Sequence, residues 1–330
     1  MSDSPPRISV VIPTYKRPEL LLRCLRAVLS QRQVDARDYE VVVVDDGHDD
    51  ATRDAVQQIA ARGDGLPVVR YLRPPQGRGP AVARNAGWRA ARGELLAFTD
   101  DDTIPSLDWL AEGERELRAH PAWVALCGRV VVPVAPPPTD HARMTQGLAT
   151  AEFVTANAFV RRHAMETVGG FDERFLRAWR EDSDLQFRLM EQAGPVGRSP
   201  IAEVVHPVRA APWGLSLSQQ RNTFFDALLY KKHPERYRTS IRPVPPWSYY
   251  ATVLLTALSI VLLVAGQGIA AGVAAIGVAV LVLRFAWQRL RHTSHDAGHV
   301  IEMLCTSALI PFLSVYWRLR GALHFRVLFL

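Results

Sequence analysis

The chain has 330 residues, enough for one large domain or two modest ones, and its 48% hydrophobic and 22% charged residues are proportions of an ordinary globular protein. Its net charge of +6 comes without a basic helix or an aromatic stacking platform, so we expect membrane lipids, and no nucleic acid, among its partners. Cys24, Cys127 and Cys305 are widely spaced and fit no pairing motif, which is typical of a reducing compartment.

Strand and helix patterns alternate in the first hundred residues. The start, MSDSPPRISVVIP, has no basic n-region and no long apolar h-region, so we predict no signal peptide. Buried-strand patterns cover residues 7–13, 39–47, 67–72 and 94–98, and helical patterns cover 18–31, 49–63 and 79–93. This alternation predicts right-handed crossovers and a parallel sheet with helices on both faces. Ligands of such sheets lie beyond the carboxyl ends of the strands, which is where the acids at 45–46 and 100–102 fall.

The pattern is looser after residue 102. Helices are expected over residues 106–120, 180–194 and 216–234, strands over 123–134 and 152–162, and a turn at 169–175. The Pro-rich segment 135–147, APPPTDHARMTQG, is expected to be an irregular loop. A second Pro-rich segment, IRPVPPW, marks the end of the catalytic part.

A long apolar region follows this linker. Residues 248–283 contain no charge, and a spanning helix needs about 20 apolar residues, so we predict two transmembrane helices at about 248–265 and 269–287. The alternative is a buried helical hairpin of a soluble core. Basic residues on both flanks favour a cytoplasmic location for the ends of the hairpin and for the N-terminal domain at the inner membrane. A third segment, about 299–318, is either an interfacial helix or a further membrane helix. The predicted organisation is therefore a catalytic domain at 1–215, a juxtamembrane helix and linker at 216–246, and a membrane segment at 247–330.

Three consecutive carboxylates follow the strand pattern at 94–98. In an extended segment, residues i and i+2 point the same way, about 6.6 to 7 Å apart, so Asp100 and Asp102 can face one site while Asp101 faces elsewhere. Two such carboxylates suit Mg²⁺ or Mn²⁺, ions that also bind substrate phosphates. A solvated acidic turn that caps the next helix is the alternative.

Five segments together resemble the family 2 glycosyltransferases, which have the GT-A fold and transfer a sugar from a nucleotide diphosphate. They are SVVIPTYKRPELLLRCLRAVLSQ, EVVVVDDGHDD, GRGPAVARNAGWRAARGELLAFTDDD, VGGFDERF and REDSDLQFRL, and they span about residues 7 to 210. The expected fold is therefore an α/β, Rossmann-like mixed sheet of the GT-A type, followed by the transmembrane hairpin.

The resemblance implies a role for particular residues. Those expected to bind the nucleotide sugar are Pro13, Thr14, Arg17, Asp45, Asp46, Gly79, Arg84, Asp100 and Asp101, with Arg78 as a further candidate. Asp100 and Asp102 fill the family's metal positions, and His206 would be either a further ligand or a satisfied loop residue. Asp182 matches the general base of inverting members, and Glu181 would orient the acceptor.

The resulting hypothesis is a metal-dependent, inverting glycosyltransferase of EC class 2.4, with Mn²⁺ or Mg²⁺ as cofactor. It would move a sugar from a nucleotide-diphosphate donor to a lipid-linked or surface-glycan acceptor at the cytoplasmic membrane face. A polyprenyl-phosphate glycosyltransferase is a narrower form of this hypothesis. A non-catalytic membrane scaffold that binds sugar nucleotides is the alternative. A dinucleotide oxidoreductase is disfavoured, because no glycine follows the first strand.

Overall fold

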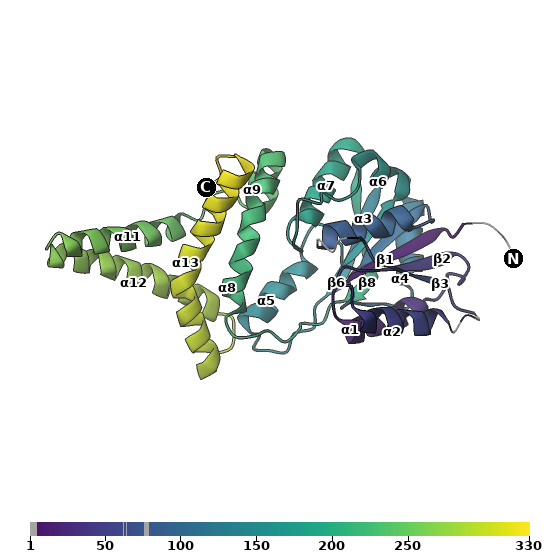
Figure 1. Ribbon diagram of the computed structural model, residues 1–330, viewed down its shortest axis with the longest axis horizontal. Coiled ribbons are helices and arrows are strands. Elements are labelled where there is room, and N and C mark those ends of the chain that lie inside the picture. The colour runs from purple at the N-terminus through teal and green to yellow at the C-terminus, as the bar shows by residue number, and fades with distance from the viewer. Residues whose placement is uncertain (1–4, 62, 64, 76–78) are drawn as a thin grey trace. The chain divides into compact units, whose positions relative to one another are not determined.

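The computed structural model describes residues 5–61, 63, 65–75 and 79–330, and the chain forms two compact units (Figure 1). The first unit contains the residues up to Pro133 together with Gln146–Pro207. The second contains Val134–Thr145 and Val208–Leu330. The sequence predicted a catalytic domain that ends at residue 215. Compact units defined by contacts do not show which residues take part in catalysis, so this domain assignment stays a prediction.

The first unit is built on one eight-stranded mixed sheet, in the order β3-β2-β1-β4-β7-β6-β8-β5. Its strands are β1 (Ile8–Thr14), β2 (Tyr39–Asp45), β3 (Val68–Leu72), β4 (Leu95–Thr99), β5 (Ile104–Pro105), β6 (Ala125–Val131), β7 (Asn157–Arg161) and β8 (Val196–Val205). The first four strands are parallel to one another, as their alternation with helices predicted. β7 runs antiparallel to both β4 and β6, so the predicted mixed α/β sheet is confirmed.

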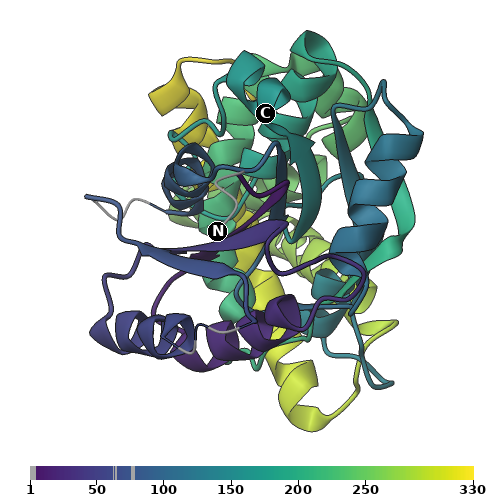
Figure 2. The ribbon, with the colours of Figure 1, turned by 90° about the vertical axis from the view of Figure 1, so that its right-hand side faces the viewer.

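Helices cover both faces of the parallel half of the sheet. The first unit contains α1 (Pro18–Leu29), α2 (Asp50–Ala60), α3 (Pro80–Ala90), α4 (Trp109–Ala119), the short turn η1 (Gly147–Ala149), α6 (Arg162–Val168) and α7 (Glu181–Gln192). Figure 2 shows α1 and α2 on one face and α3 on the other. α3 packs closely, because a Cβ atom on Gly87 would come within 2.4 Å of Val11 Cγ1.

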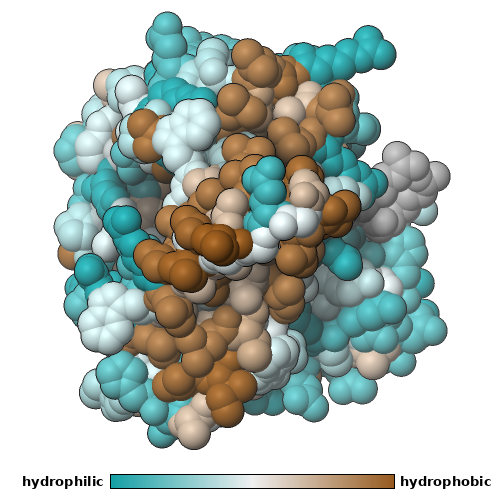
Figure 3. Space-filling model, turned by 90° about the vertical axis from the view of Figure 1, so that its left-hand side faces the viewer, coloured by the Kyte–Doolittle hydropathy of each residue, from teal (hydrophilic) through white to brown (hydrophobic). Residues whose placement is uncertain are grey.

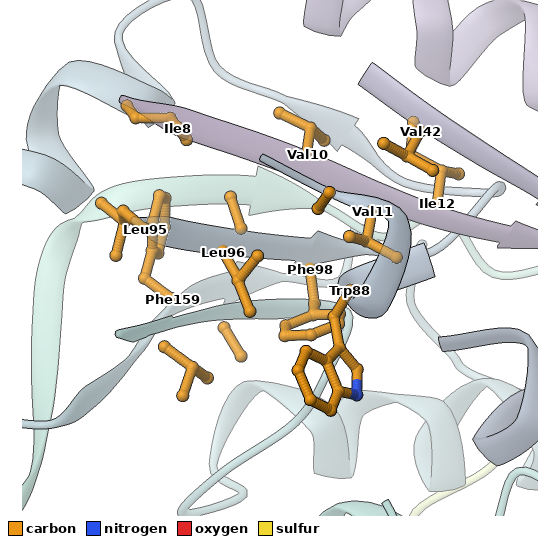
Figure 4. Close-up of a cluster of buried hydrophobic side chains, with 14 of the residues drawn as sticks. Ile8, Val10, Val11, Ile12, Val42, Trp88, Leu95, Leu96, Phe98 and Phe159 are labelled. Atoms are coloured by element: carbon orange, nitrogen blue, oxygen red, sulfur yellow. The ribbon is translucent and has the colours of Figure 1, made fainter. Parts of the chain in front are cut away.

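The apolar runs that predicted the strands form the core between these layers. Val10, Val11 and Ile12 of β1 and Leu96 and Phe98 of β4 are fully buried, and Figure 4 shows them together with Trp88 of α3. Burying a side chain such as Phe98 contributes roughly 1.5–3 kcal/mol. The rigid core fixes the strand ends from which the acidic residues project.

Three segments differ from the sequence-based prediction. The irregular loop expected at 135–147 contains a helix, α5 (Asp140–Gln146), because Thr139 caps it: its hydroxyl accepts the Ala142 N–H at 3.2 Å and its carbonyl the Arg143 N–H at 3.0 Å. Only Asn157–Arg161 of the strand expected at 152–162 is extended, and α6 follows it directly. The single helix expected at 216–234 is divided into α8 (Leu215–Gln219), η2 (Gln220–Asn222) and α9 (Thr223–Lys232).

The second unit contains three long apolar helices. After α10 (Pro234–Arg236) and the π-helical turn η3 (Tyr237–Ile241) come α11 (Trp247–Val264), α12 (Gly268–Leu290) and α13 (Ala297–Phe325). Each is long and apolar enough to cross a membrane. α11 and α12 contain the two predicted transmembrane helices, and α13 contains the third segment, with Pro311 inside it.

The surfaces of α11 and α12 fit lipid better than the core of a soluble protein. Val264 is 84% exposed and Ile269 90% exposed at the turn between the two helices. Figure 3 shows hydrophobic side chains gathered over this part of the second unit. An apolar surface of this extent in water would be an aggregation hazard, so membrane association explains it best.

The segment 134–145 packs on the apolar helices of the second unit. Arg289 of α12 donates to Asp140 of α5 at 2.7 Å, and the pair is nearly buried. The same guanidinium donates to Thr306 Oγ1 and Ser307 Oγ of α13 at 2.7 and 3.1 Å. This network explains why α5 belongs mostly to the second unit although it lies within the sequence of the first.

Candidate functional site

The end of β1 holds the middle carboxylate of the acidic triplet. Thr14 Oγ1 donates to Asp101 Oδ2 at 2.7 Å, and Arg17 lies 3.2 Å from Asp101 Oδ1. Pro13, the residue before Thr14, pairs in register with Val44 of β2. Burial raises the pKa of Asp101 to about 6, although Arg17 and Thr14 act in the opposite direction. Both oxygens of Asp101 are therefore engaged within the protein.

The other two carboxylates of the triplet meet a histidine from the far side of the sheet. One oxygen each of Asp100 and Asp102 and one nitrogen of His206 lie within 4.8 Å of one another. His206 directly follows β8, and its Nε2 is 3.6 Å from Asp102 Oδ1. The chain is not extended here as the sequence argument assumed: Asp101 and Asp102 lie in a turn, in which the Thr103 N–H donates to the Asp100 carbonyl at 3.2 Å. The turn, and not the spacing of residues i and i+2 in a strand, directs Asp101 away from the cluster.

This cluster has the donor set of a divalent cation site. Two carboxylate oxygens and an imidazole nitrogen suit Mn²⁺ and also suit Mg²⁺ when substrate oxygens complete the coordination. His206 is buried, and its Nδ1 has no hydrogen-bond partner among the described residues. Burial acts to raise the pKa of Asp100, but the charges of Arg84 and His206 outweigh it and hold the pKa below its usual range. Asp100 is therefore ionised, as a metal ligand must be.

Arg84 joins this cluster to the start of α7. Its guanidinium is nearly buried and donates to Asp100 Oδ1 at 2.8 Å and to Glu181 Oε1 at 3.0 Å. The guanidinium also lies over the ring of Phe171, 5.7 Å from its centroid. One fixed cation thus links the end of β4, the middle of α3 and the first residue of α7.

Glu181 and Asp182 open α7 side by side. Burial raises the pKa of both carboxyl groups, and the neighbouring charge of Asp182 raises that of Glu181 further. Asp182 Oδ1 accepts the Ser183 N–H at 2.7 Å, whereas Oδ2 receives no hydrogen bond from another described residue. One oxygen of Asp182 is therefore available to a hydroxyl group from outside the chain. By contrast, Asp184 is fully buried in an ion pair with Arg188 at 2.8 Å.

The two acids after β2 have different surroundings. Asp45 is fully buried, and it accepts from the N–H groups of Gly47 and Asp49 at 2.9 and 2.8 Å and from the Tyr71 hydroxyl at 2.7 Å. Asp46 is only half-buried, and its Oδ2 accepts the Gly79 N–H at 2.9 Å. Asp45 therefore organises the turn, and Asp46 is the acid of the two that is partly exposed.

Gly79 is required by its backbone geometry. Its φ of +98° is strained for other residues, and a Cβ atom there would lie 2.4 Å from the Leu176 carbonyl oxygen. It directly precedes α3, so it sets the path by which the chain reaches Arg84. The candidate Arg78 lies outside the described residues.

Asn85 is a positioning residue that the motif analysis missed. Its Oδ1 accepts the Phe171 N–H at 2.8 Å, and its Nδ2 donates to the Phe171 carbonyl at 2.9 Å and to Glu173 at 2.8 Å. These bonds fasten the turn at 169–175 to α3, next to Arg84. The only feature of the sequence that could have indicated this role is a lone amide on a helix face. Nothing in the sequence shows that its partners are Phe171 and Glu173.

The sheet, the acidic cluster at its strand ends and the charged start of α7 define a transferase of the GT-A type. The sequence profile of Glycosyl transferase family 2 matches residues 9–175, just over half of the chain. The chain therefore belongs to this family, and the resemblance inferred from the five motifs is confirmed.

Several characterised proteins are similar to this chain. Glycosyltransferase AglE of Haloferax volcanii is 31% identical over 186 residues, which cover 53% of this chain and 59% of that protein. Validoxylamine A glucosyltransferase of Streptomyces hygroscopicus subsp. jinggangensis is 30% identical over 255 residues, covering 66% and 56% of the two chains. The matched region thus spans little more than half the length of these relatives.

A solved structure supports the fold assignment. The mannosyltransferase PcManGT of Pyrobaculum calidifontis, in complex with GDP-Man and Mn²⁺, superposes with a TM-score of 0.60 at 22% sequence identity. The alignment covers 96% of this chain and 88% of that chain. The predicted GT-A fold with an apolar helical C-terminal region is therefore confirmed.

Proposed function

We propose that this chain is a metal-dependent, inverting glycosyltransferase that uses a nucleotide-diphosphate sugar as donor. The observation that carries the proposal is the chain of contacts from the Asp100, Asp102 and His206 cluster through Arg84 to Glu181 and Asp182. In this proposal, the groups on one side of the buried Arg84 serve the leaving diphosphate and those on the other side serve the acceptor. A non-catalytic scaffold would not need two acids with raised pKa values at the start of α7.

The donor pocket is proposed to lie at the ends of β1, β2 and β4. We propose that Asp46 and the backbone around Gly79 contact the nucleoside and that Pro13 forms part of the wall. Arg17 and Arg84 offer cationic charge to phosphates. Three of the expected nucleotide-binding residues do not contact the donor in this proposal: Asp45, Thr14 and Asp101. Their polar atoms already make hydrogen bonds within the protein, which hold the loops that shape the pocket.

Asp100, Asp102 and His206 are the residues proposed to hold a divalent cation, either Mn²⁺ or Mg²⁺. The complex of PcManGT with GDP-Man and Mn²⁺ is consistent with this choice. Such an ion, when bound, neutralises the negative charge that develops on a departing diphosphate. Asp102 and His206 are both buried, so bulk water competes little with an ion for their ligand atoms.

Asp182 is the proposed general base. Its free oxygen accepts the proton of the acceptor hydroxyl, whose oxygen attacks the anomeric carbon as the bond to the diphosphate breaks. The raised pKa of Asp182 strengthens it as a base near neutral pH. Glu181, held by Arg84, orients the acceptor beside it. Attack opposite the leaving group inverts the anomeric configuration.

The acceptor is proposed to be lipid-linked or a surface glycan, at the cytoplasmic face of the inner membrane. The apolar helices α11–α13 and the basic residues that flank them support this location. Among the similar proteins, a glucosyltransferase of Campylobacter jejuni acts on GalNAc(5)-diNAcBac-PP-undecaprenol, and it is 33% identical over 97 residues. Holding the active site beside the bilayer raises the effective concentration of a lipid substrate.

The test is sugar transfer by membranes that contain the full chain, with labelled nucleotide sugars and Mn²⁺ or Mg²⁺. Asp182→Asn should abolish turnover while donor binding persists, and the matched Asp54→Asn on the exposed face of α2 should leave turnover unchanged. NMR of the product should show an anomeric configuration opposite to that of the donor. Full turnover by Asp182→Asn, or transfer that survives EDTA, would refute the proposed mechanism.

A further inference from the structure

A cavity of about 220 Å³ lies at the linker end of the apolar helices in the second unit. Arg242 from the linker, Ser248 and Tyr249 from the first turn of α11, and Arg284 and Gln288 from the last turns of α12 line it. The rest of the wall consists of Pro246, Thr252, Leu281, Phe285 and Pro311. Every polar side chain named here can donate a hydrogen bond.

The cavity is cationic. Among the described residues that line it none is acidic, and neither Arg242 nor Arg284 makes a side-chain hydrogen bond or ion pair with another described residue. Arg289, five positions after Arg284, shows the contrast: Asp140 and three hydroxyl groups satisfy it. A second cavity of this unit has mixed charge, because Asp140 and Glu302 line it beside Arg209. In the first cavity both arginines are exposed, so their guanidinium groups are accessible to an anion from outside the chain.

The cavity lies where a lipid headgroup would be. Trp247 at the start of α11 and Trp287 near the end of α12 are 58% and 66% exposed, as expected for an aromatic belt at a membrane surface. Beyond them, toward the turn between the helices, the exposed side chains are apolar (Figure 3). If the headgroup of an anionic lipid bound here, the hydrocarbon chains of that lipid would lie along an apolar surface.

We propose that this cavity binds the phosphate headgroup of an anionic membrane lipid. The two guanidinium groups donate to the phosphate oxygens, and Ser248, Tyr249 and Gln288 supply further donors. Basic pockets between membrane helices on the cytoplasmic side suit such headgroups. The site is distinct from the acidic cluster of the first unit, and the proposal stands whether or not the proposed transferase activity is correct.

The test compares lipid binding by the full chain and by Arg242→Gln/Arg284→Gln, purified in detergent and titrated with phosphatidylglycerol. The matched control is Arg221→Gln/Arg291→Gln, which removes the same charge from two exposed arginines of the same basic flanks outside the cavity. Each cavity arginine should contribute about fivefold and the pair about 25-fold in affinity. Native mass spectrometry counts the bound lipids, and the melting temperature measured with and without lipid reports the stabilisation.

A loss of affinity confined to the cavity variant supports the site, whereas equal losses in the cavity and control variants would overturn it. If the double variant does not fold, the two single variants replace it, and each should lose about fivefold. Inorganic phosphate serves as the free anion and phosphatidylcholine as the zwitterionic lipid. Stabilisation by inorganic phosphate as large as by phosphatidylglycerol, or equal binding of both lipids, would refute the proposal of an anionic lipid site.

Discussion

Replacing Arg84 by glutamine tests whether one buried cation holds the candidate site together. The substitution keeps a hydrogen-bonding group but removes the positive charge between Asp100 and Glu181. The Glu181 side chain is only 4% exposed, so water cannot replace the guanidinium there, whereas Asp100 at 29% is partly relieved by solvent. Removing one partner of a buried ion pair costs about 3–5 kcal/mol. For a unit of this size, that corresponds to a fall in melting temperature of about 6–20 °C.

The loss should depend on pH in a defined direction. Without Arg84, the pKa of Glu181, already raised by burial, rises further in the folded protein. The folded state then binds more protons than the unfolded chain, so its stability falls as pH rises through this window. The pKa of Glu181 is about 8 with Arg84 present, so both folded proteins bind this proton at lower pH, and the difference from the wild type should grow as pH rises above about 8. Adding Glu181→Gln should recover part of the loss, because it removes the unpaired charge.

Scanning fluorimetry of the full chain in detergent measures both effects. The matched control is Arg89→Gln on the same helix, whose partner Glu173 is exposed and 3.4 Å away. An exposed pair contributes at most about 1 kcal/mol, so the control should change the melting temperature by less than about 4 °C. If Arg84→Gln were no more destabilising than Arg89→Gln, or if its effect grew toward acidic pH, the assignment of Arg84 as the central buried cation would be wrong.

Three further predictions concern the loop, the base and the cluster. Gly79→Ala forces a Cβ atom against the Leu176 carbonyl and should cost roughly 1–3 kcal/mol and raise the KM for the donor, whereas Gly147→Ala, which meets nothing within 4 Å, should be neutral in both assays. The pH profile of kcat/KM should have an acidic limb whose apparent pKa lies above the ordinary aspartate value of about 3.9. The reason is that the pKa of Asp182 is raised, so the base is protonated and inactive at pH values below this pKa. An apparent pKa at or under the ordinary value contradicts the assignment of Asp182 as the base. His206→Ala should weaken Mn²⁺ binding at least about tenfold by electron paramagnetic resonance, while the exposed His163→Ala binds as the wild type does; equal affinities would exclude His206 as a ligand.

The parallel half of the sheet was predictable because its signals are local. Continuous apolar runs such as residues 41–44 become strands buried on both faces, and helical spacing identifies the segments between them. The position of the acids at the strand ends follows from topology alone, whereas the direction of Asp101 depends on the turn that follows β4. The uncharged stretch at 248–283 likewise predicts long apolar helices from its composition.

The other half of the sheet and the details of the site depend on contacts between residues that are distant in the sequence, which no local pattern predicts. β8 has the sequence VGRSPIAEVV, and only its end, the AEVV before His206, has a strand-like pattern. The proline and polar residues of its first half hide the rest of a strand that is paired on both sides, with β6 and β5. Whether Asp45 or Asp46 stays open to a ligand depends on Tyr71 and Gly79, which are distant in sequence. His206 could be placed near the acids only by the family resemblance, because the sheet order that brings it there is not legible from its neighbours.

Because the segment 134–145 belongs to the second unit, no single cut in the coding sequence separates the two units. The chain passes between them three times, after Pro133, Thr145 and Pro207, so neither unit is one uninterrupted stretch of codons. A protein ending at Pro207 would retain Asp140 and lose Arg289, which leaves a carboxylate without its cation and α5 without its support. Water-soluble versions for crystallisation therefore need a short bridge in place of 134–145. Recombination that exchanged the second unit between relatives would have to replace both of its segments, 134–145 and 208–330, at once.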